Sequence, residues 1–392
     1  MTHRNFYITS LMWATAMLAA ALFLSCNADK TRHGDRLDTD CDSIKFKYAR
    51  NISAIQLQDC KVVTINDPWH HDKTLSQYVL VARDDSASYA SRHDRPQGTV
   101  VYTPLRRVIT FASPHNFLLV TLGMEHSIVG ACDIEYNKVE KIRRMAKEKK
   151  IADCGNAMQP SMETIIETTP DALLMCSYES RGQMHIEKLG IPVIECAEYM
   201  ETSALGRAEW MRFYGMLMGC EDRADSLFHV VESRYTDVAQ KAKTRGKRKR
   251  VLTERVYNGT WYCPGGNSSM GRLIADAGAD YVFAKRSESG SLSLSPETVI
   301  NTAADADVWL FVYDGNSPMT RDQLLKELPG YALIKAFRDG NFYQCSASHS
   351  TYFDELSFRP DLLIRNIAEI LYPDMFDNAE YRYYRKYKQS AQ

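Results

Sequence analysis

Short apolar runs alternate with amphipathic stretches along most of this chain. Runs such as RRVITFAS at 106–113, LLMCSY at 173–178 and VWLFVY at 308–313 have the apolar character of buried strands, and stretches with helical spacing lie between them. Strands that alternate with helices are typical of βαβ units and a mainly parallel sheet. The pattern therefore predicts an α/β protein.

Two parts of the chain depart from this alternation. Residues 203–243 carry apolar side chains at helical spacing, and the second of the two helices predicted there, about 221–243, has no strand after it until 250. No proline or glycine lies between 221 and 243, so this helix is expected to be unbroken. The next predicted strand is VLTERVY at 251–257. Residues 46–104 hold short strand-like runs, which predict an antiparallel extension. We therefore predict two Rossmann-like lobes with mainly parallel sheets, joined by one long interdomain helix and preceded by a short N-terminal β extension.

One segment of the chain nearly repeats another. Residues 161–172 read SMETIIETTPDA, residues 295–306 read SPETVINTAADA, and each runs into an apolar strand. The serine that opens each copy is a plausible helix N-cap. Glu163 and Glu297 then fall in the first helical turn, where the helix dipole favours a carboxylate. The repeat predicts two similar lobes, although any α/β protein reuses helix starts and strands.

The N-terminus has the pattern of an export signal. Arg4 supplies positive charge, residues 6–24 are largely apolar, and Ser25 before Cys26 resembles a bacterial lipobox. In this interpretation Cys26 is lipidated and becomes the mature N-terminus. The alternative is an uncleaved anchor, because the apolar stretch is nearly long enough to span a bilayer. We predict a lipid-anchored protein of the cell envelope that faces the periplasm.

These patterns divide the chain into six parts. The predicted parts are a signal peptide (1–26), a tether (27–45), an N-terminal lobe with its β extension (46–220), a connecting helix (221–245), a C-terminal lobe (246–376) and a tail (377–392).

Composition and motifs give little support to nucleic-acid binding or catalysis. The formal net charge is −1, and the basic run at 241–250 has no interleaved aromatic residues. The ten cysteines include no CxxC pair, so a structural zinc site has weak support. No nucleophile elbow, zinc-protease motif, P-loop or dinucleotide fingerprint is present. A triad assembled from scattered side chains remains an alternative, since triads are defined by geometry.

The order of the segments resembles that of a known family. Six stretches and the long helix follow one another over about 105–373. Before the helix come RRVITFASPHNFLLVTLGMEHSIVGACD, PSMETIIETTPDALL and EKLGIPVIEC. After it come NGTWYCPGGNSSMGRLIADAGADYVF, SLSLSPETVINTAADADVWLF and DELSFRPDLLIRNIAEILYP. Together they resemble class III substrate-binding proteins of ABC importers. The preceding YARNISAIQLQDCKVVTINDPW resembles the Bacteroidetes members of that group.

The resemblance implies a function and partners. Its members bind iron–siderophore complexes, haem or vitamin B12, carry no intrinsic cofactor, and deliver the ligand to a membrane permease dimer. In this family a glutamate on each lobe forms a salt bridge with permease arginines, and Glu163 and Glu297 are the matching positions. The resemblance therefore implies a monomeric lipoprotein that docks on an importer.

Candidate ligand-binding residues lie where the predicted strands end, because α/β sheets bind ligands beyond their carboxyl ends. Trp261 and Tyr262 would form an aromatic wall against a large, flat ligand. His115 is a candidate ligand of haem iron or another metal, or else it caps a helix or bonds a loop. Arg181 is a candidate partner for a siderophore carboxylate, or an ordinary surface arginine. The full set is His115, Tyr136, Tyr178, Arg181, Trp261, Tyr262, Tyr313 and Tyr352.

The identity of the ligand stays open at this stage. No cluster of arginines is predicted at the cleft, and no clear His/Tyr pair marks haem. Three alternatives remain: binding of a free metal ion, surface capture without an importer, and an enzyme that uses the cleft between the lobes.

Overall fold

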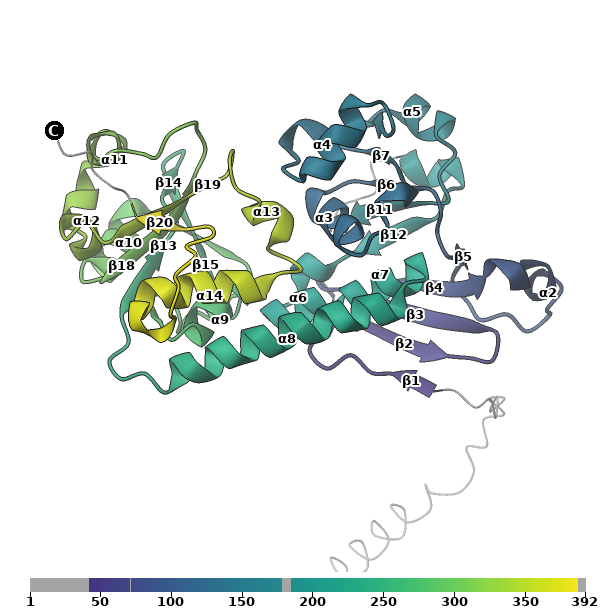
Figure 1. Cartoon of the computed structure of the whole chain (residues 1–392), viewed down its shortest axis with the longest axis horizontal. Coiled ribbons are helices and arrows are strands. Elements are labelled where there is room, and N and C mark those ends of the chain that lie inside the picture. Colours follow the sequence, from purple (N-terminus) through teal and green to yellow (C-terminus); the bar gives the residue numbers. More distant parts are fainter. Residues whose placement is uncertain (1–41, 71, 178–184, 387–392) are drawn as a thin grey trace, which may run out of the picture. The chain divides into compact units, whose positions relative to one another are not determined.

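A computed structural model describes residues 42–70, 72–177 and 185–386 of the chain (Figure 1). The described residues confirm the predicted α/β class, with two mainly parallel sheets in separate lobes. The predictions for Cys26, Tyr178 and Arg181 concern positions outside the described residues. No helix in the described part of the chain combines the length and the apolar character that a membrane span requires.

The first lobe is built on a five-stranded parallel sheet with the order β12-β11-β6-β7-β8. Its strands are β6 (Val108–Thr110), β7 (Ile128–Ala131), β8 (Ala152–Asp153), β11 (Ala172–Cys176) and β12 (Val193–Cys196). The helices α3 (Ser113–Thr121), α4 (Glu140–Lys147) and α5 (Met162–Glu167) lie between them in the chain. These elements match the predicted alternation of strands and helices.

The second lobe has a sheet with the order β16-β13-β18-β19-β20. Its parallel strands are β13 (Arg250–Thr253), β16 (Asp280–Tyr281), β18 (Val308–Tyr313) and β19 (Phe342–Ser346), and β20 (Arg385–Lys386) pairs antiparallel with β19. A smaller antiparallel sheet contains β14 (Val256–Tyr257), β15 (Thr260–Pro264) and β17 (Ser291–Leu294). The helices are α9 (Ser269–Asp276), α10 (Pro296–Ala303), α11 (Arg321–Glu327), α12 (Lys335–Arg338), α13 (Tyr352–Glu355) and α14 (Pro360–Leu371).

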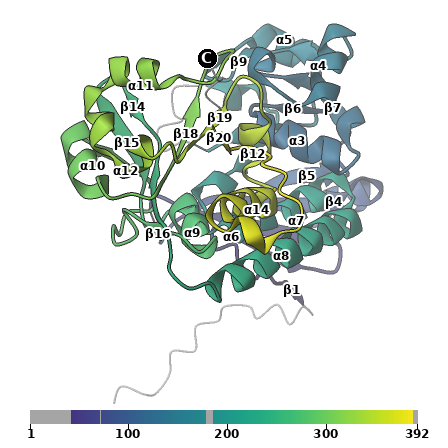
Figure 2. The ribbon, with the colours of Figure 1, turned by 60° about the vertical axis from the view of Figure 1, so that its left-hand side comes forward.

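The long helix predicted at about 221–243 is confirmed. It is α8 (Glu221–Lys243), and it follows α6 (Ala204–Glu209) and α7 (Met211–Met218). Gly219 adopts a left-handed φ of 66° that ends α7 and turns the chain into α8. α8 packs against α7 and against α14 of the second lobe (Figures 1 and 2). One helix therefore contacts elements of both lobes.

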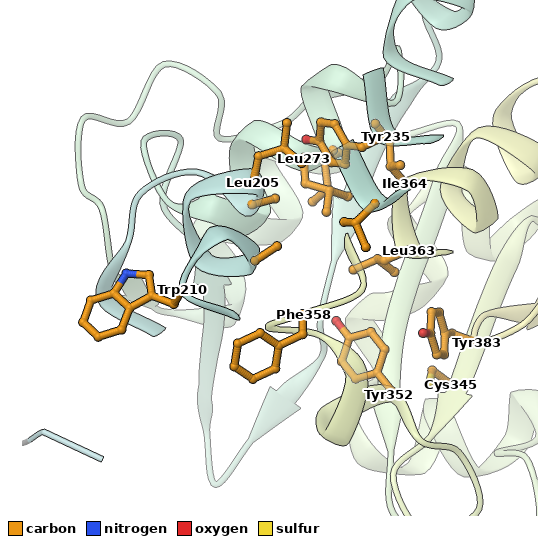
Figure 3. Close-up of a cluster of buried hydrophobic side chains, with 14 of the residues drawn as sticks. Leu205, Trp210, Tyr235, Leu273, Cys345, Tyr352, Phe358, Leu363, Ile364 and Tyr383 are labelled. Carbon is orange, nitrogen blue, oxygen red and sulfur yellow. The ribbon is translucent and has the colours of Figure 1, made fainter. Parts of the chain in front are cut away.

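The hydrophobic core continues from the connecting helices into the second lobe. Figure 3 shows Leu205 of α6 and Tyr235 of α8 beside Leu273 of α9 and Ile364 of α14. All four side chains are buried in the same cluster. The connecting helices are thus part of a shared core, which restricts independent movement of the second lobe.

The N-terminal extension is a five-stranded sheet in chain order. Its strands are β1 (Asp42–Ile44), β2 (Ile52–Gln56), β3 (Cys60–Asn66), β4 (Thr74–Ala82) and β5 (Thr99–Thr103). The prediction of an antiparallel arrangement is correct up to β4, but β5 runs parallel to β4. The predicted tether at 27–45 is too long by one strand, because residues 42–44 pair with β2.

Two buried carboxylates, one in α6 and one just before it, hold this extension in place. Glu209 of α6 accepts the backbone N–H groups of Lys47, Tyr48 and Ala49 at 2.7, 2.7 and 2.9 Å. Glu201 accepts those of the next two residues at 2.8 to 3.0 Å. Five consecutive backbone donors between β1 and β2 are therefore satisfied by two side chains, as buried polar groups require.

The predicted tail at 377–392 is wrong for its described part. The N–H groups of Tyr383 and Tyr384 bond Asn366 Oδ1 of α14 at 3.1 and 2.7 Å. Those of Glu380 and Tyr381 bond Glu369 at 3.3 and 3.1 Å. The segment then enters the sheet as β20. Because buried side chains of α14 accept its backbone donors, this segment is an integral part of the second lobe.

Candidate functional site

A hollow of about 1040 Å³ lies at the carboxyl ends of β18 and β19, which end at Tyr313 and Ser346. We call it the C-terminal hollow. The turn at 349–351 and the segment 380–386 complete its lining. Ligands of α/β proteins bind beyond the carboxyl ends of parallel strands, so this position is where a ligand site is expected.

Side-chain hydrogen bonds fix the floor of the hollow. The carboxamide of Gln344 accepts from the N–H of Met319 and donates to its carbonyl, both at 2.8 Å. The hydroxyl oxygen of Ser346 accepts the N–H of His349 at 3.1 Å. Both loops above the strand ends are therefore held by side chains of β19, and the polar groups on the floor have defined positions.

The segment 380–386 supplies cations to one side of the hollow. Arg382 forms a two-pronged ion pair with Glu355 of α13, at 2.5 and 2.9 Å, and Tyr383 also donates to Glu355. Burial opposes ionisation of Glu355, but its hydrogen bonds from Arg382 and Tyr383 prevail, so the pKa of this carboxyl is lowered. Arg382 is thus committed to a structural ion pair.

Arg385 and Lys386 make weaker contacts in the structure. Arg385 donates to the Tyr381 carbonyl and Lys386 to the Asn341 side-chain oxygen, each at 3.2 Å. Both acceptors are neutral, and both cations are exposed. Arg385 pairs with Gln344 and lies on its face of the sheet, so its charge is presented at the hollow. Lys386 pairs with Tyr343 on the opposite face, and its ammonium group bonds Asn341 before the amino end of β19.

The expectation that Trp261 lines an open cleft is wrong. Its side chain is 0% exposed, its Nε1 donates to the Thr253 carbonyl at 3.1 Å, and its ring packs on Tyr331 at 5.5 Å. Alternation along β15 turns Trp261 and Cys263 into the core and Tyr262 outward. Trp261 is therefore a core residue.

Tyr262 keeps its candidate role in the aromatic wall, and Tyr257 joins it. The two tyrosines are 43% and 64% exposed. Tyr257 is paired with Thr260, two residues before Tyr262, so both rings project from one face of the small sheet. Sequence analysis missed Tyr257 because it read residues 251–257 as a single strand.

The structure breaks that strand at Glu254, a group that sequence analysis also missed. Glu254 adopts a left-handed φ of 60° at the carboxyl end of β13. Burial raises the pKa of its carboxyl to about 7, although a backbone N–H bond from Val312 partly offsets this. No motif marks such a residue, because its burial depends on neighbours from distant segments.

His115 and Tyr352 are buried rather than open to a ligand. His115 is 0% exposed, and its Nε2 lies 3.1 Å from Glu198 Oε1. Burial alone would raise the pKa of the Glu198 carboxyl, but the contact with His115 prevails and the pKa is lowered. Tyr352 is 3% exposed and its hydroxyl accepts that of Tyr384 at 3.4 Å. The expectation that these side chains face a ligand is therefore corrected, and neighbouring Phe353, 52% exposed, is the open aromatic residue of α13.

The two remaining described candidates differ in exposure. Tyr313 lines the C-terminal hollow while only 6% exposed overall. Tyr136, 66% exposed, follows Asp133 at the carboxyl end of β7 in the first lobe. Within the described residues, no group of three or more His, Cys, Asp or Glu side chains is placed to hold a bare metal ion. The structure thus gives the free-ion alternative no ligand set there.

Both repeat glutamates occupy the predicted helix starts. Ser161 and Ser295 accept the N–H of the residue three positions later, at 3.3 and 3.2 Å, which confirms both N-caps. Glu163 and Glu297 are the second residues of α5 and α10, and both are exposed. Their role in docking remains a prediction.

The lobes, their strand-end site and the connecting helix define a two-lobed α/β binding protein. A family model described as periplasmic binding protein matches residues 108–348. The chain belongs to this periplasmic binding protein family.

Comparison with individual proteins agrees with this assignment. An uncharacterised lipoprotein of Methanocaldococcus jannaschii is 28% identical over 363 residues, which cover 87% of this chain and 85% of the relative. Among solved structures, an Fe³⁺-hydroxamate transport system of Saccharomonospora viridis shares 21% identity, with a TM-score of 0.54 over 68% of this chain and 93% of its own. A periplasmic haem-binding protein of Pseudomonas aeruginosa shares 19%, with a TM-score of 0.55 over 69% and 94%. These structures show the fold, and the resemblance to Bacteroidetes members stays a prediction.

Proposed function

We propose that this protein captures an iron complex, either a siderophore or haem, or else cobalamin, in the cell envelope and delivers it to an ABC importer. The C-terminal hollow carries the proposal. Its volume of about 1040 Å³ is large for a single ion and suits an organic ligand of many atoms.

Exposed aromatic side chains near strand ends support a large ligand. Tyr257 and Tyr262 present two rings from one face in the second lobe, and Tyr136 presents one in the first. Aromatic rings bury much area at low conformational cost, which favours flat or apolar ligands. Family members of the same fold named for Fe³⁺-hydroxamate transport and haem binding agree with this ligand class.

Delivery would use the two exposed glutamates. One carboxylate per lobe, at Glu163 and Glu297, would let a permease dimer hold a monomer of this protein by both lobes. Exposed ion pairs of this kind contribute modestly to affinity and more to the correct alignment of the two proteins. Lipidation at Cys26 would keep the protein at the membrane, and mass spectrometry of the mature N-terminus tests that step.

Thermal unfolding with a panel of probes tests the function. Haemin, cobalamin, a ferric hydroxamate and ferric citrate are each added to the purified protein. A ligand at 100 times its Kd should stabilise the folded state by about 2.7 kcal/mol. If no probe raises the midpoint at millimolar concentration, the proposed ligand class is wrong. Uptake assays with and without the permease then separate delivery from surface capture.

A further inference from the structure

The helices of the internal repeat, α5 and α10, differ in how their outer faces are covered. We infer that the exposed face of α5, formed by Glu163, Ile166 and Glu167, is the main contact of this protein with the importer permease. The permease segment on this face would place an apolar side chain on Ile166 and basic side chains on the two carboxylates. This inference rests on the proposed delivery to an importer and names the surface that delivery would use.

Both copies of the repeat have an isoleucine at the same helical position. Ile166 of α5 and Ile300 of α10 each lie five residues after the serine N-cap. The residue before each isoleucine, Ile165 or Val299, is 0% exposed and faces the core. Ile300 is 8% exposed, whereas Ile166 is 54% exposed. Equivalent apolar side chains are therefore covered in the second lobe and open in the first.

A short segment of the second lobe covers Ile300. It is the 3₁₀ helix η7 (Pro329–Leu333), which packs on α10. A Cβ atom on Gly330 would lie 2.6 Å from Ile300 Cδ1, so the backbone of η7 lies directly on the isoleucine. Among the hydrophobic clusters of the described residues, the main one includes Ile300 and none includes Ile166. The repeat thus shows what kind of contact the open isoleucine would accept, namely a short apolar segment.

The charges on α5 indicate what else the partner must carry. Glu163 lies three positions before Ile166 and four before Glu167, so the three side chains share one face of the helix. Both glutamates are exposed, and in the part of the chain that the structure describes neither forms an ion pair. Like charges four residues apart destabilise a helix slightly, and a basic partner would remove that repulsion. The position of Glu167 is Asn301 in α10, so the first lobe offers two carboxylates where the second offers one.

The position of α5 leaves this face open to a large partner. Both views place α5 on the side of the first lobe opposite to α8 (Figures 1 and 2). Two copies of this chain that met through α5 would bring four carboxylates together, and such like-charge contacts are unfavourable. A surface of one isoleucine and two carboxylates is also small, which suits a partner that binds briefly and then releases the protein. These features favour the permease over a second copy of the chain.

Photo-crosslinking in living cells tests which protein covers α5. In the full-length lipoprotein, the photoreactive amino acid benzoylphenylalanine replaces Ile166, Asn301 on α10, or Val230, which is a 44% exposed side chain of α8 and the matched control. Mass spectrometry identifies the crosslinked protein. We expect position 166 to capture a permease subunit of an ABC importer, position 301 to capture less of it, and position 230 to capture none.

Binding of purified variants to membranes that contain the captured permease then measures each contribution. Ile166→Ser should weaken binding about tenfold, or ~1.4 kcal/mol, as expected for losing the burial of about half an isoleucine side chain. Glu167→Gln should weaken it about threefold, and this loss should shrink as salt rises because salt screens exposed charges. Val230→Ser should bind like the wild type. Thermal midpoints should be nearly the same for all variants, since each changes an exposed side chain.

The outcomes separate this inference from the proposed function. If position 166 captures no permease, or captures only a second copy of this chain, the inference is overturned. Normal binding by both Ile166→Ser and Glu167→Gln also overturns it. In each of these cases the proposed delivery stands if position 301 captures a permease or if uptake of the ligand requires one. If neither holds, the proposed delivery is overturned as well.

Discussion

Replacing Glu209 with Gln tests how the N-terminal sheet is held. Glu209 is fully buried, and its two oxygens accept three backbone N–H groups from residues 47–49 at 2.7 to 2.9 Å. Oε1 takes one of these bonds and Oε2 takes two. A glutamine keeps one oxygen and replaces the other with an NH₂ group, which donates instead of accepting.

The magnitude follows from counting the donors that lose their acceptor. In the better of the two amide orientations, one buried N–H is left unsatisfied and faces another donor, and the remaining bonds lose their charge. An unsatisfied buried donor costs roughly 1–3 kcal/mol, and hydrogen bonds to charged groups are stronger than neutral ones. We expect Glu209→Gln to lower the free energy of unfolding by about 2–4 kcal/mol.

Urea denaturation measures this loss, and hydrogen exchange locates it. Exchange should accelerate at residues 47–56, where the anchored segment enters β2, while amides of β18 and β19 stay protected. Glu297→Gln is the matched control, since an exposed glutamate at a helix start should change stability by less than about 0.5 kcal/mol. A loss below about 1 kcal/mol for Glu209→Gln would refute the idea that this carboxylate anchors the sheet.

Three further predictions follow from the site. Trp261→Ala should lower the free energy of unfolding by about 3–5 kcal/mol, as for other buried aromatic residues. Tyr262→Ala should leave stability nearly unchanged and weaken ligand binding about two- to tenfold, as measured by titration. Equal effects of the two changes on stability would contradict the assigned faces of β15. Burial raises the pKa of Glu254 from 4.5 to about 7 in the folded protein, so its contribution to stability is fully present below about pH 4.5 and is lost as pH rises through 7. Glu254→Gln should therefore stabilise the protein at pH 8 and not at pH 4. If denaturation of the variant has the same pH dependence as that of the wild type, this reasoning is wrong. Glu163→Gln combined with Glu297→Gln should leave ligand affinity and stability unchanged but reduce uptake more than either single change, and normal uptake by the double variant would show that these residues only begin helices.

Much of the fold was predictable because its signals are local. Serine at a helix start, glutamate in the first turn and a following apolar strand run are enough to predict α5 and α10. The absence of proline and glycine between 221 and 243 predicted an unbroken helix, which α8 confirms. These features depend on residues within a few positions of one another.

The candidate site was predicted less well, because exposure depends on which face of a strand turns inward. A strand read as continuous over 251–257 breaks at Glu254, and the following hairpin turns Trp261 to the core and Tyr257 to the solvent. His115 and Tyr352 lie near strand ends as expected, yet both are buried by distant segments. Tyr214 of α7 packs on His115, and Tyr383 and Tyr384 pack on Tyr352. Position along the chain thus located the region but not the accessible side chains.

The amino-acid sequence by itself determined the order of strands and helices, the long connecting helix, the equivalent glutamates of the two lobes and the family resemblance. Only the tertiary structure decided how the two ends of the described chain are used. The N–H of Ala49 and its acceptor Glu209 are 160 positions apart in the chain. The N–H of Tyr384 bonds Asn366 of α14, and no periodic pattern in the sequence predicts that this segment contacts this helix. Every residue except proline has the same backbone N–H donor, so the sequence does not show which buried side chain will accept its hydrogen bond. Tertiary packing brings donor and acceptor together, and in this way the polar segment 380–386 comes to line the C-terminal hollow.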